Sequence, residues 1–159
     1  MPKDLTQTDP DTLTASAARL RLAITRAARR LRQEAAGELT PTTVAALATV
    51  ERHGPMTPSE LADVERIRRP TATRSLRALE EAGLVVRTPD PADGRSALVS
   101  VTPGGRERLR RLRGRKNAYL AKRMRDLPRA DVETLERAAA ILEEMLERER
   151  RPSAGGERG

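Results

Sequence analysis

Apolar residues at both ends of the chain recur with the spacing of helices. From Leu13 to Leu31 they stand 4, 3, 4, 3 and 4 positions apart, which predicts one long helix with a heptad-like seam that stops near Gly37. A last helix is predicted from about Arg129 to Arg150, where the apolar residues are Val132, Leu135, Ala139, Leu142 and Leu146. Two such seams are hard to bury in one small monomer, so they favour a dimer.

Three shorter helices are predicted between the seams from their capping residues. Thr40-Pro41 opens the first, and His53-Gly54-Pro55 ends it, with Gly54 expected in a left-handed cap. Thr57 and Glu60 form a capping box for the second. The third runs from about Pro70 to Ala82 and is closed by Gly83, with Ala72, Leu76 and Leu79 facing inward.

A β-hairpin is predicted after these helices. Residues 84–86 form a short strand, residues 88–94 a loop rich in proline and aspartate, and residues 97–101 a second strand. Thr102-Pro103 then opens a long helix that reaches about Arg125. The predicted fold is therefore mainly α with a small two-stranded β-wing: a winged helix-turn-helix flanked by long dimerisation helices.

Positive charge is concentrated where such a fold would read DNA. The chain carries 31 lysines and arginines against 23 acids, a net charge of +8, which favours a polyanionic partner. Around the predicted recognition helix, Glu65 is the lone acid; the cations are Arg66, Arg68, Arg69, Arg74 and Arg77, and Thr71, Thr73 and Ser75 add hydroxyl groups. Arginine can bind guanine through two hydrogen bonds, and threonine can contact phosphate or a thymine methyl group.

Composition excludes several other classes of protein. There is no cysteine, one histidine and one aromatic residue, Tyr119, so cysteine chemistry and a multi-histidine metal site are absent. No acid–base–nucleophile set or phosphate loop is present either, so we expect no enzyme and no cofactor. The chain lacks a membrane-spanning apolar run and an apolar signal core after Met1, which predicts a soluble cytoplasmic protein without a membrane partner.

Four segments of the chain carry specific motifs: Gly54-Pro-Met-Thr-Pro-Ser-Glu-Leu-Ala62, Arg69-Pro-Thr-Ala-Thr-Arg74, Leu79-Glu-Glu-Ala-Gly-Leu-Val85 and, most specifically, the wing Pro89-Asp-Pro-Ala-Asp-Gly-Arg-Ser-Ala-Leu-Val-Ser-Val-Thr102. Together they closely resemble the MarR family of winged-helix transcriptional regulators. In the wing, Asp93, Arg95 and Thr102 match the family's Asp-x-Arg signature and the strand end that follows it. The resemblance covers about residues 12–150.

The resemblance implies a homodimer that binds a pseudo-palindromic operator on double-stranded DNA and, often, a small ligand that weakens binding. Arg69, Thr71, Thr73 and Arg74 match recognition-helix positions, and Arg95 matches the wing arginine that reaches the minor groove or is braced by Asp93. Arg68 and Arg77 complete the predicted DNA-binding set.

Three residues depart from the family pattern and put the sequence preference in doubt. Arg66 stands where a turn glycine is common, and a left-handed conformation there would cost on the order of 1 kcal/mol. Arg68 replaces a frequent capping serine, which removes a cap and adds a cation. Gly94 stands at the wing tip where a basic residue is common.

The predicted organisation is a flexible N-terminus (1–11), dimerisation helices (12–36 and 103–150), a DNA-binding region (38–102) and a disordered tail (151–159). The predicted function is a sequence-specific transcriptional regulator, more readily a repressor than an activator, with a small-molecule effector of unknown identity. The alternatives are a ligand-independent regulator and a nucleoid-style architectural protein with little sequence preference. The ten cations between Arg106 and Arg125, against Glu107 alone, either face DNA and the acidic last helix or serve solubility.

Overall fold

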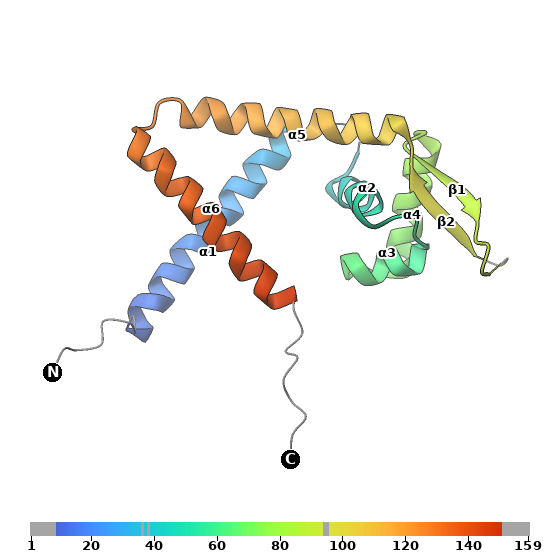
Figure 1. Cartoon of the computed structure of the whole chain (residues 1–159), viewed down its shortest axis with the longest axis horizontal. Coiled ribbons are helices and arrows are strands. Elements are labelled where there is room, and N and C mark those ends of the chain that lie inside the picture. The colour runs from blue at the N-terminus through green and yellow to red at the C-terminus, as the bar shows by residue number, and fades with distance from the viewer. Residues whose placement is uncertain (1–8, 36, 38, 94–95, 151–159) are drawn as a thin grey trace, which may run out of the picture. The chain divides into compact units, whose positions relative to one another are not determined.

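The computed structural model describes residues 9–35, 37, 39–93 and 96–150, which form six helices and one hairpin (Figure 1). The elements are α1 (Pro10–Glu34), α2 (Pro41–His53), α3 (Pro58–Glu65), α4 (Arg69–Glu81), β1 (Val85–Pro89), β2 (Ala97–Val101), α5 (Pro103–Met124) and α6 (Arg129–Arg150). The predicted fold class, mainly α with a small two-stranded wing, is confirmed. The predicted flexible residues 1–8 and tail 151–159 lie outside the described residues.

Helix starts follow the predicted caps. The Thr40 hydroxyl accepts from the backbone N–H of Thr43, and Thr57 and Glu60 form both bonds of the capping box. α1 begins at Pro10, inside the segment predicted to be flexible, because the Asp9 carboxylate accepts from the N–H of Thr12. Proline in the first turn of these helices removes a donor that would have no partner within the helix.

The end of α2 differs from its prediction. Gly54 has φ −68° and ψ 166°, so it is extended and not left-handed. Glycine is needed there for space, because a Cβ atom would lie 2.6 Å from the Val50 carbonyl oxygen. After the cis Gly54–Pro55 bond, Met56 exchanges backbone hydrogen bonds with Val99 of β2, an isolated β-bridge that the sequence did not predict.

The wing is an antiparallel pair in which Val85 lies opposite Val101 and Pro89 opposite Ala97. Its first strand extends through Thr88 and Pro89, two residues that were predicted to start the loop. The cause is the register, because Thr88 pairs with Leu98 and the ladder continues to Ala97, the first residue of β2. Proline is tolerated here since β1 has a neighbour on one side only.

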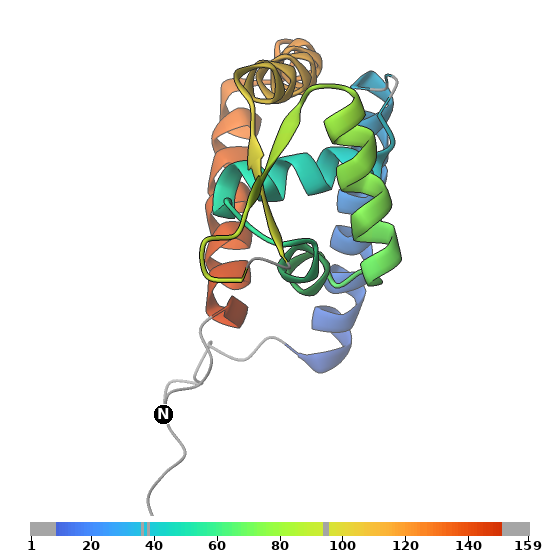
Figure 2. The ribbon, with the colours of Figure 1, turned by 90° about the vertical axis from the view of Figure 1, so that its right-hand side faces the viewer.

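One aliphatic core holds the winged helix together. Leu47, Leu61, Leu76, Leu79 and Val99 are completely buried where α2, α3, α4 and the hairpin meet. Leu109 and Leu112 attach α5 to this region. Figure 2 shows α2 lying between α5 and α3, with α4 and the hairpin beside them. The core therefore fixes α4 against α2 and α3 through the apolar face of α4.

The chain divides within α5 into two units, and Tyr119 is the last residue of the first unit. In the first unit, Arg30 of α1 lies 5.6 Å from the ring centre of Tyr119 and donates to its hydroxyl at 3.3 Å, which raises the pKa of Arg30. No described residue of α1 is buried. In the second unit, α6 exposes a row of large apolar side chains: Leu135, Ile141, Met145 and Leu146.

Candidate nucleic-acid interface

The predicted DNA-binding residues lie largely on one side of α4. Ala72, Ser75, Leu76 and Leu79 form its buried face. Arg69, Thr73, Arg74 and Arg77 are exposed and Thr71 is partly buried, while Arg68 stands just before the helix and is exposed. The structure thus brings six of the eight predicted residues together on one element and its entry.

The turn into α4 is built without glycine. Arg66 adopts φ 51° and ψ 43°, the left-handed conformation, and the Ile67 N–H reaches back to the Ala62 carbonyl at 3.0 Å. This confirms the left-handed position considered for Arg66. Arg68 makes no side-chain cap bond, so the loss of the cap is also confirmed. Compared with the family pattern, the turn has two additional exposed cations, Arg66 and Arg68. It lacks the unstrained glycine and the capping serine.

The acid nearest the turn is held against the neighbouring helix. Glu65 ends α3, and its carboxylate accepts a hydrogen bond from the hydroxyl of buried Thr49 in α2. This bond fixes the end of α3 beside α2. The first turn of α4 contains no acid, so its exposed surface keeps an excess of positive charge.

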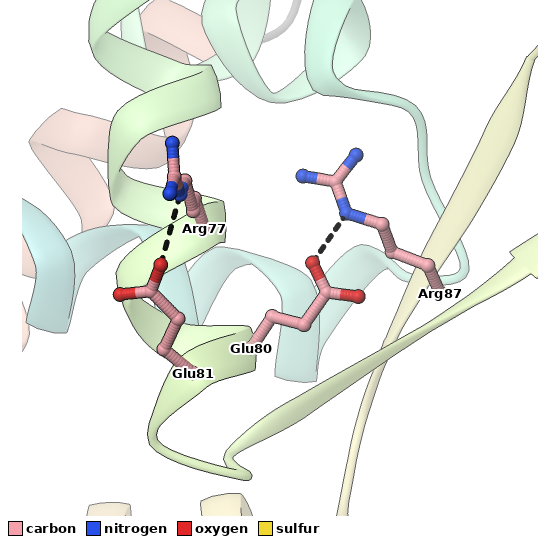
Figure 3. Close-up of polar contacts among 4 residues, drawn as sticks. All are labelled: Arg77, Glu80, Glu81 and Arg87. Atoms are coloured by element: carbon pink, nitrogen blue, oxygen red, sulfur yellow. Dashed lines mark hydrogen bonds and ion pairs between the residues drawn. The ribbon is translucent and has the colours of Figure 1, made fainter.

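Two carboxylates lie at the C-terminal end of α4, where each pairs with an arginine (Figure 3). Arg77 Nε lies 2.8 Å from a Glu81 oxygen on the same helix, and Arg87 Nε of β1 lies 2.8 Å from Glu80. Arg87 was not singled out by the sequence analysis. Its place on a strand that follows the acidic end of a helix is the signal that could have indicated an ion pair. The Arg87–Glu80 pair links the wing root to α4, whereas Arg77 must leave Glu81 to reach a phosphate.

Thr102 makes a second link between wing and recognition helix. Its hydroxyl donates to the Gly83 carbonyl at 2.8 Å and accepts from the Gly105 N–H at 3.0 Å. Gly105 is required for this close contact, because a Cβ atom there would lie 2.2 Å from the Leu84 carbonyl oxygen. The left-handed conformation of Gly83 and the missing side chain of Gly105 therefore set how the chain passes from α4 into the wing and from the wing into α5.

The wing loop is closed by backbone bonds. The Asp90 N–H donates to the Ser96 carbonyl at 3.1 Å, and the Ser96 N–H donates to the Asp93 carbonyl at 2.8 Å. Asp93 is exposed at the near side of the tip. Gly94 and Arg95 lie outside the described residues, so bracing of Arg95 by Asp93 stays a prediction.

A cavity of about 560 Å³ lies in the first unit beside the winged helix. The end of α1, the following loop, α2 and α5 line it: Arg32, Ala35, Gly37, Leu39, Thr40, Pro41, Val44, Ala45, Ala48, Leu112 and Lys116. Its two ionisable groups, Arg32 and Lys116, are both cationic. Beside it, the guanidinium of Arg108 lies against Gly37, and its buried Nε has no hydrogen-bond partner in the described part of the chain.

Within the described ranges, no group of three or more histidine, aspartate or glutamate side chains could hold a metal ion. None of the described helices combines the length and apolar character needed to cross a bilayer.

Comparisons with known proteins agree with this geometry. Residues 39–97 match the sequence profile of the MarR family. An uncharacterized HTH-type transcriptional regulator of Mycobacterium bovis is 37% identical over 124 residues, which cover 77% of this chain and 87% of that protein. The crystal structure of a putative transcriptional regulator from Pseudomonas aeruginosa is 33% identical, with a TM-score of 0.78 over 87% of this chain and 98% of that one.

A more distant structure shares the fold. A mutant of MepR from S. aureus, solved bound to an oligodeoxyribonucleotide, is 17% identical, with a TM-score of 0.64 over 82% of this chain and 97% of that chain.

Proposed function

Because the chain belongs to the MarR family of transcriptional regulators and is not an enzyme, we propose that it represses transcription as a homodimer bound to a pseudo-palindromic operator. The observation that carries this proposal is the exposed arginine and threonine face of α4, whose opposite face is fixed in the core. A helix positioned in this way can enter the major groove with its first turns against base edges. A protein that binds the chromosome in this way works in the cytoplasm.

The position of each residue on α4 decides whether it contacts bases or phosphates. Arg69, Thr71, Thr73 and Arg74 lie in the first two turns and contact base edges and nearby phosphates. Arg68 and Arg77 contact phosphates, which position the protein but carry no sequence information. The wing reaches the neighbouring minor groove through Arg95, and Asp93 is the acid that braces this arginine. The Arg87–Glu80 pair and the Thr102 bonds support this reading, since they keep the wing at a constant angle to α4.

Uncovered apolar side chains support the homodimer. Leu13 is 58% exposed in α1, and Ile141 and Leu146 are 58% and 61% exposed in α6. Burying such a side chain contributes about 1.5–3 kcal/mol relative to leaving it in water. A second copy that covers both helices also gives two recognition helices, which matches the two half-sites of a palindrome.

The cavity beside α2 supports an effector. Its walls are mostly aliphatic, and besides Thr40 the polar side chains that line it are the cations Arg32 and Lys116, so it suits an amphipathic anion with an apolar body and a carboxylate. A ligand there would separate the end of α1 from α2 and α5 and shift the recognition helix that α2 supports. The test measures the Tm of the protein with and without medium-chain carboxylates, and the control variant Ala48→Trp fills the cavity. An increase in Tm for the wild type but not for the variant supports an effector. No increase in Tm for either protein supports the ligand-independent regulator.

Selection from random duplexes tests sequence specificity directly. Repeated binding and amplification should yield one inverted repeat, with half-site centres about one helical turn apart. Competition with excess random DNA then separates the alternatives, because an operator binder keeps its site at about 10³–10⁷ tighter affinity and an architectural protein loses it. Transcription from a promoter that overlaps the selected site should fall when the protein is added; a rise would identify an activator.

A further inference from the structure

The first half of α5 carries a dense positive charge that the proposed operator contacts do not use. From residue 106 to residue 115 there are six arginines against one glutamate, a net charge of +5. Ten helical residues span about 15 Å, so there is one net charge per ~3 Å. One strand of DNA carries one negative charge per ~3.4 Å along the axis, nearly the same linear density.

Five of these arginines are exposed, and we call them the α5 arginine surface: Arg106, Arg110, Arg111, Arg113 and Arg115. Two have acid partners, since Arg110 pairs with Glu107 and Arg113 with Glu51 of α2. In the described part of the chain, Arg106, Arg111 and Arg115 pair with no carboxylate. The fold therefore does not account for these three charges.

The position of the surface separates it from the recognition face. Gly105, Leu109 and Leu112 hold α5 against the core, and Arg113 turns toward Glu51 of α2, whereas Arg106, Arg111 and Arg115 are exposed. α5 starts beside Gly83, at the opposite end of α4 from Arg69 (Figures 1 and 2). α4 has 13 residues and is about 20 Å long, and the width of α5 adds about 10 Å. The start of α5 is therefore separated by the length of α4, about 20 Å, from the turns that are proposed to contact the first duplex.

We propose that the α5 arginine surface binds the phosphate backbone of a second duplex, without sequence preference, while α4 holds the first. Linear charge density and position favour duplex DNA, which is also the polyanion already nearest to an operator-bound protein. Gly114 adds support: it lies mid-helix between the arginines, costs about 1 kcal/mol relative to alanine, and a Cβ atom there would meet nothing within 4 Å. No contact with another described residue explains this glycine, whereas close approach of a DNA backbone would.

Two substitutions test the surface. Arg111→Gln with Arg115→Gln removes two unpaired charges, and Arg111→Lys with Arg115→Lys is the matched control that keeps them. Each lost phosphate contact lowers affinity about 15-fold at about 50 mM salt, so the glutamine variant should bind the second duplex ~200-fold more weakly. The slope of log affinity against log salt should fall by about 1.8.

The assay reads the two duplexes separately. A short duplex that carries the selected operator is immobilised. Retention of the protein on this duplex reports binding through α4. Capture of a labelled random duplex reports binding at the second site. The proposal expects wild type and the lysine variant to capture the second duplex, and the glutamine variant to be retained on the operator without capturing it. Undiminished capture by the glutamine variant would overturn the proposal, because two α4 helices of a dimer would then be bridging.

Two further results would also overturn it. One is a wild type that is retained on the operator but captures no second duplex. The other is a changed sedimentation coefficient in the glutamine variant, which would assign the arginines to contacts between copies of the chain. If the wild type is not retained at all, the operator proposal has failed instead. The affinity of the free glutamine variant for random duplex then decides the α5 proposal, and equality with wild type would contradict it.

Discussion

Replacing Arg66 by glycine should stabilise the protein and weaken its binding to DNA. Arg66 has φ 51° at the turn between α3 and α4, where a residue with a Cβ atom is strained by about 1–2 kcal/mol. Glycine relieves that strain but loses about 0.5–1 kcal/mol more conformational freedom on folding. The midpoints of these two ranges give a net gain in unfolding free energy of about 0.75 kcal/mol. For a chain of this size, the increase in Tm should be about 1–4 °C.

The same change removes an exposed cation next to the recognition helix. If that cation contacts a phosphate, the slope of log affinity against log salt falls by about 0.9 for each subunit. Stability and DNA affinity therefore move in opposite directions. A general loss of folding could not produce this result.

Two control substitutions separate backbone strain from charge. Arg66→Ala keeps the left-handed strain and loses the charge, so it should reproduce the binding defect without the gain in Tm. Gly83→Ala places a Cβ at φ 68° in open space, so it should cost about 1–2 kcal/mol through backbone strain alone. Calorimetry and binding titrations measure both quantities. A Tm of Arg66→Gly equal to or below that of Arg66→Ala would refute the strain argument.

Further predictions concern the core, the wing and the dimer. Leu76→Ala removes a completely buried side chain of α4 and should cost about 2–5 kcal/mol in denaturant unfolding; a smaller loss would mean that the helix is not anchored as described. Glu80→Gln releases Arg87 and should change the unfolding free energy by less than ~1 kcal/mol. It should nevertheless raise hydrogen exchange in the wing, and unchanged exchange would rule out the tie. Truncation after Asp126 removes α6 and should abolish the dimer and most operator affinity; sedimentation as an unchanged dimer would contradict it. Overall DNA affinity should fall roughly 10³–10⁵-fold between about 50 and 200 mM salt, and a flat plot would exclude phosphate-dominated binding.

The sequence predicted the helices well because their signals are local. Thr40, Thr57 and Glu60 cap the residues immediately after them, and the 3- and 4-residue spacings give each helix its apolar face. The exposed positions on α4 followed from the same periodicity, since residues on the side of the helix opposite Ala72 and Leu76 must face outward.

What the sequence did not predict depends on contacts between distant residues. The pairing of Met56 with Val99 and the extension of β1 to Pro89 are set by strand register. Gly54 is extended rather than left-handed, and a Cβ atom there would meet the carbonyl oxygen of Val99 in β2 as well as that of Val50. Arg87 gained its place in the site from Glu80, seven residues before it on another element. No local pattern distinguishes that arginine from the others in so basic a chain.

The most direct test of the proposed function is the response of base preference to Arg74. Wild-type protein and Arg74→Ala should be titrated against the selected operator and all its single-base variants. Arg74 lies one turn into α4 and is exposed on the side away from the core, so its removal should cost about 1–3 kcal/mol per half-site and erase preference at one symmetric pair of positions. Arg95→Ala should instead weaken all variants, most strongly those with A·T-rich flanks. If Arg74→Ala lowers every variant equally and Arg95→Ala changes the preferred bases, α4 is not the element that reads the sequence.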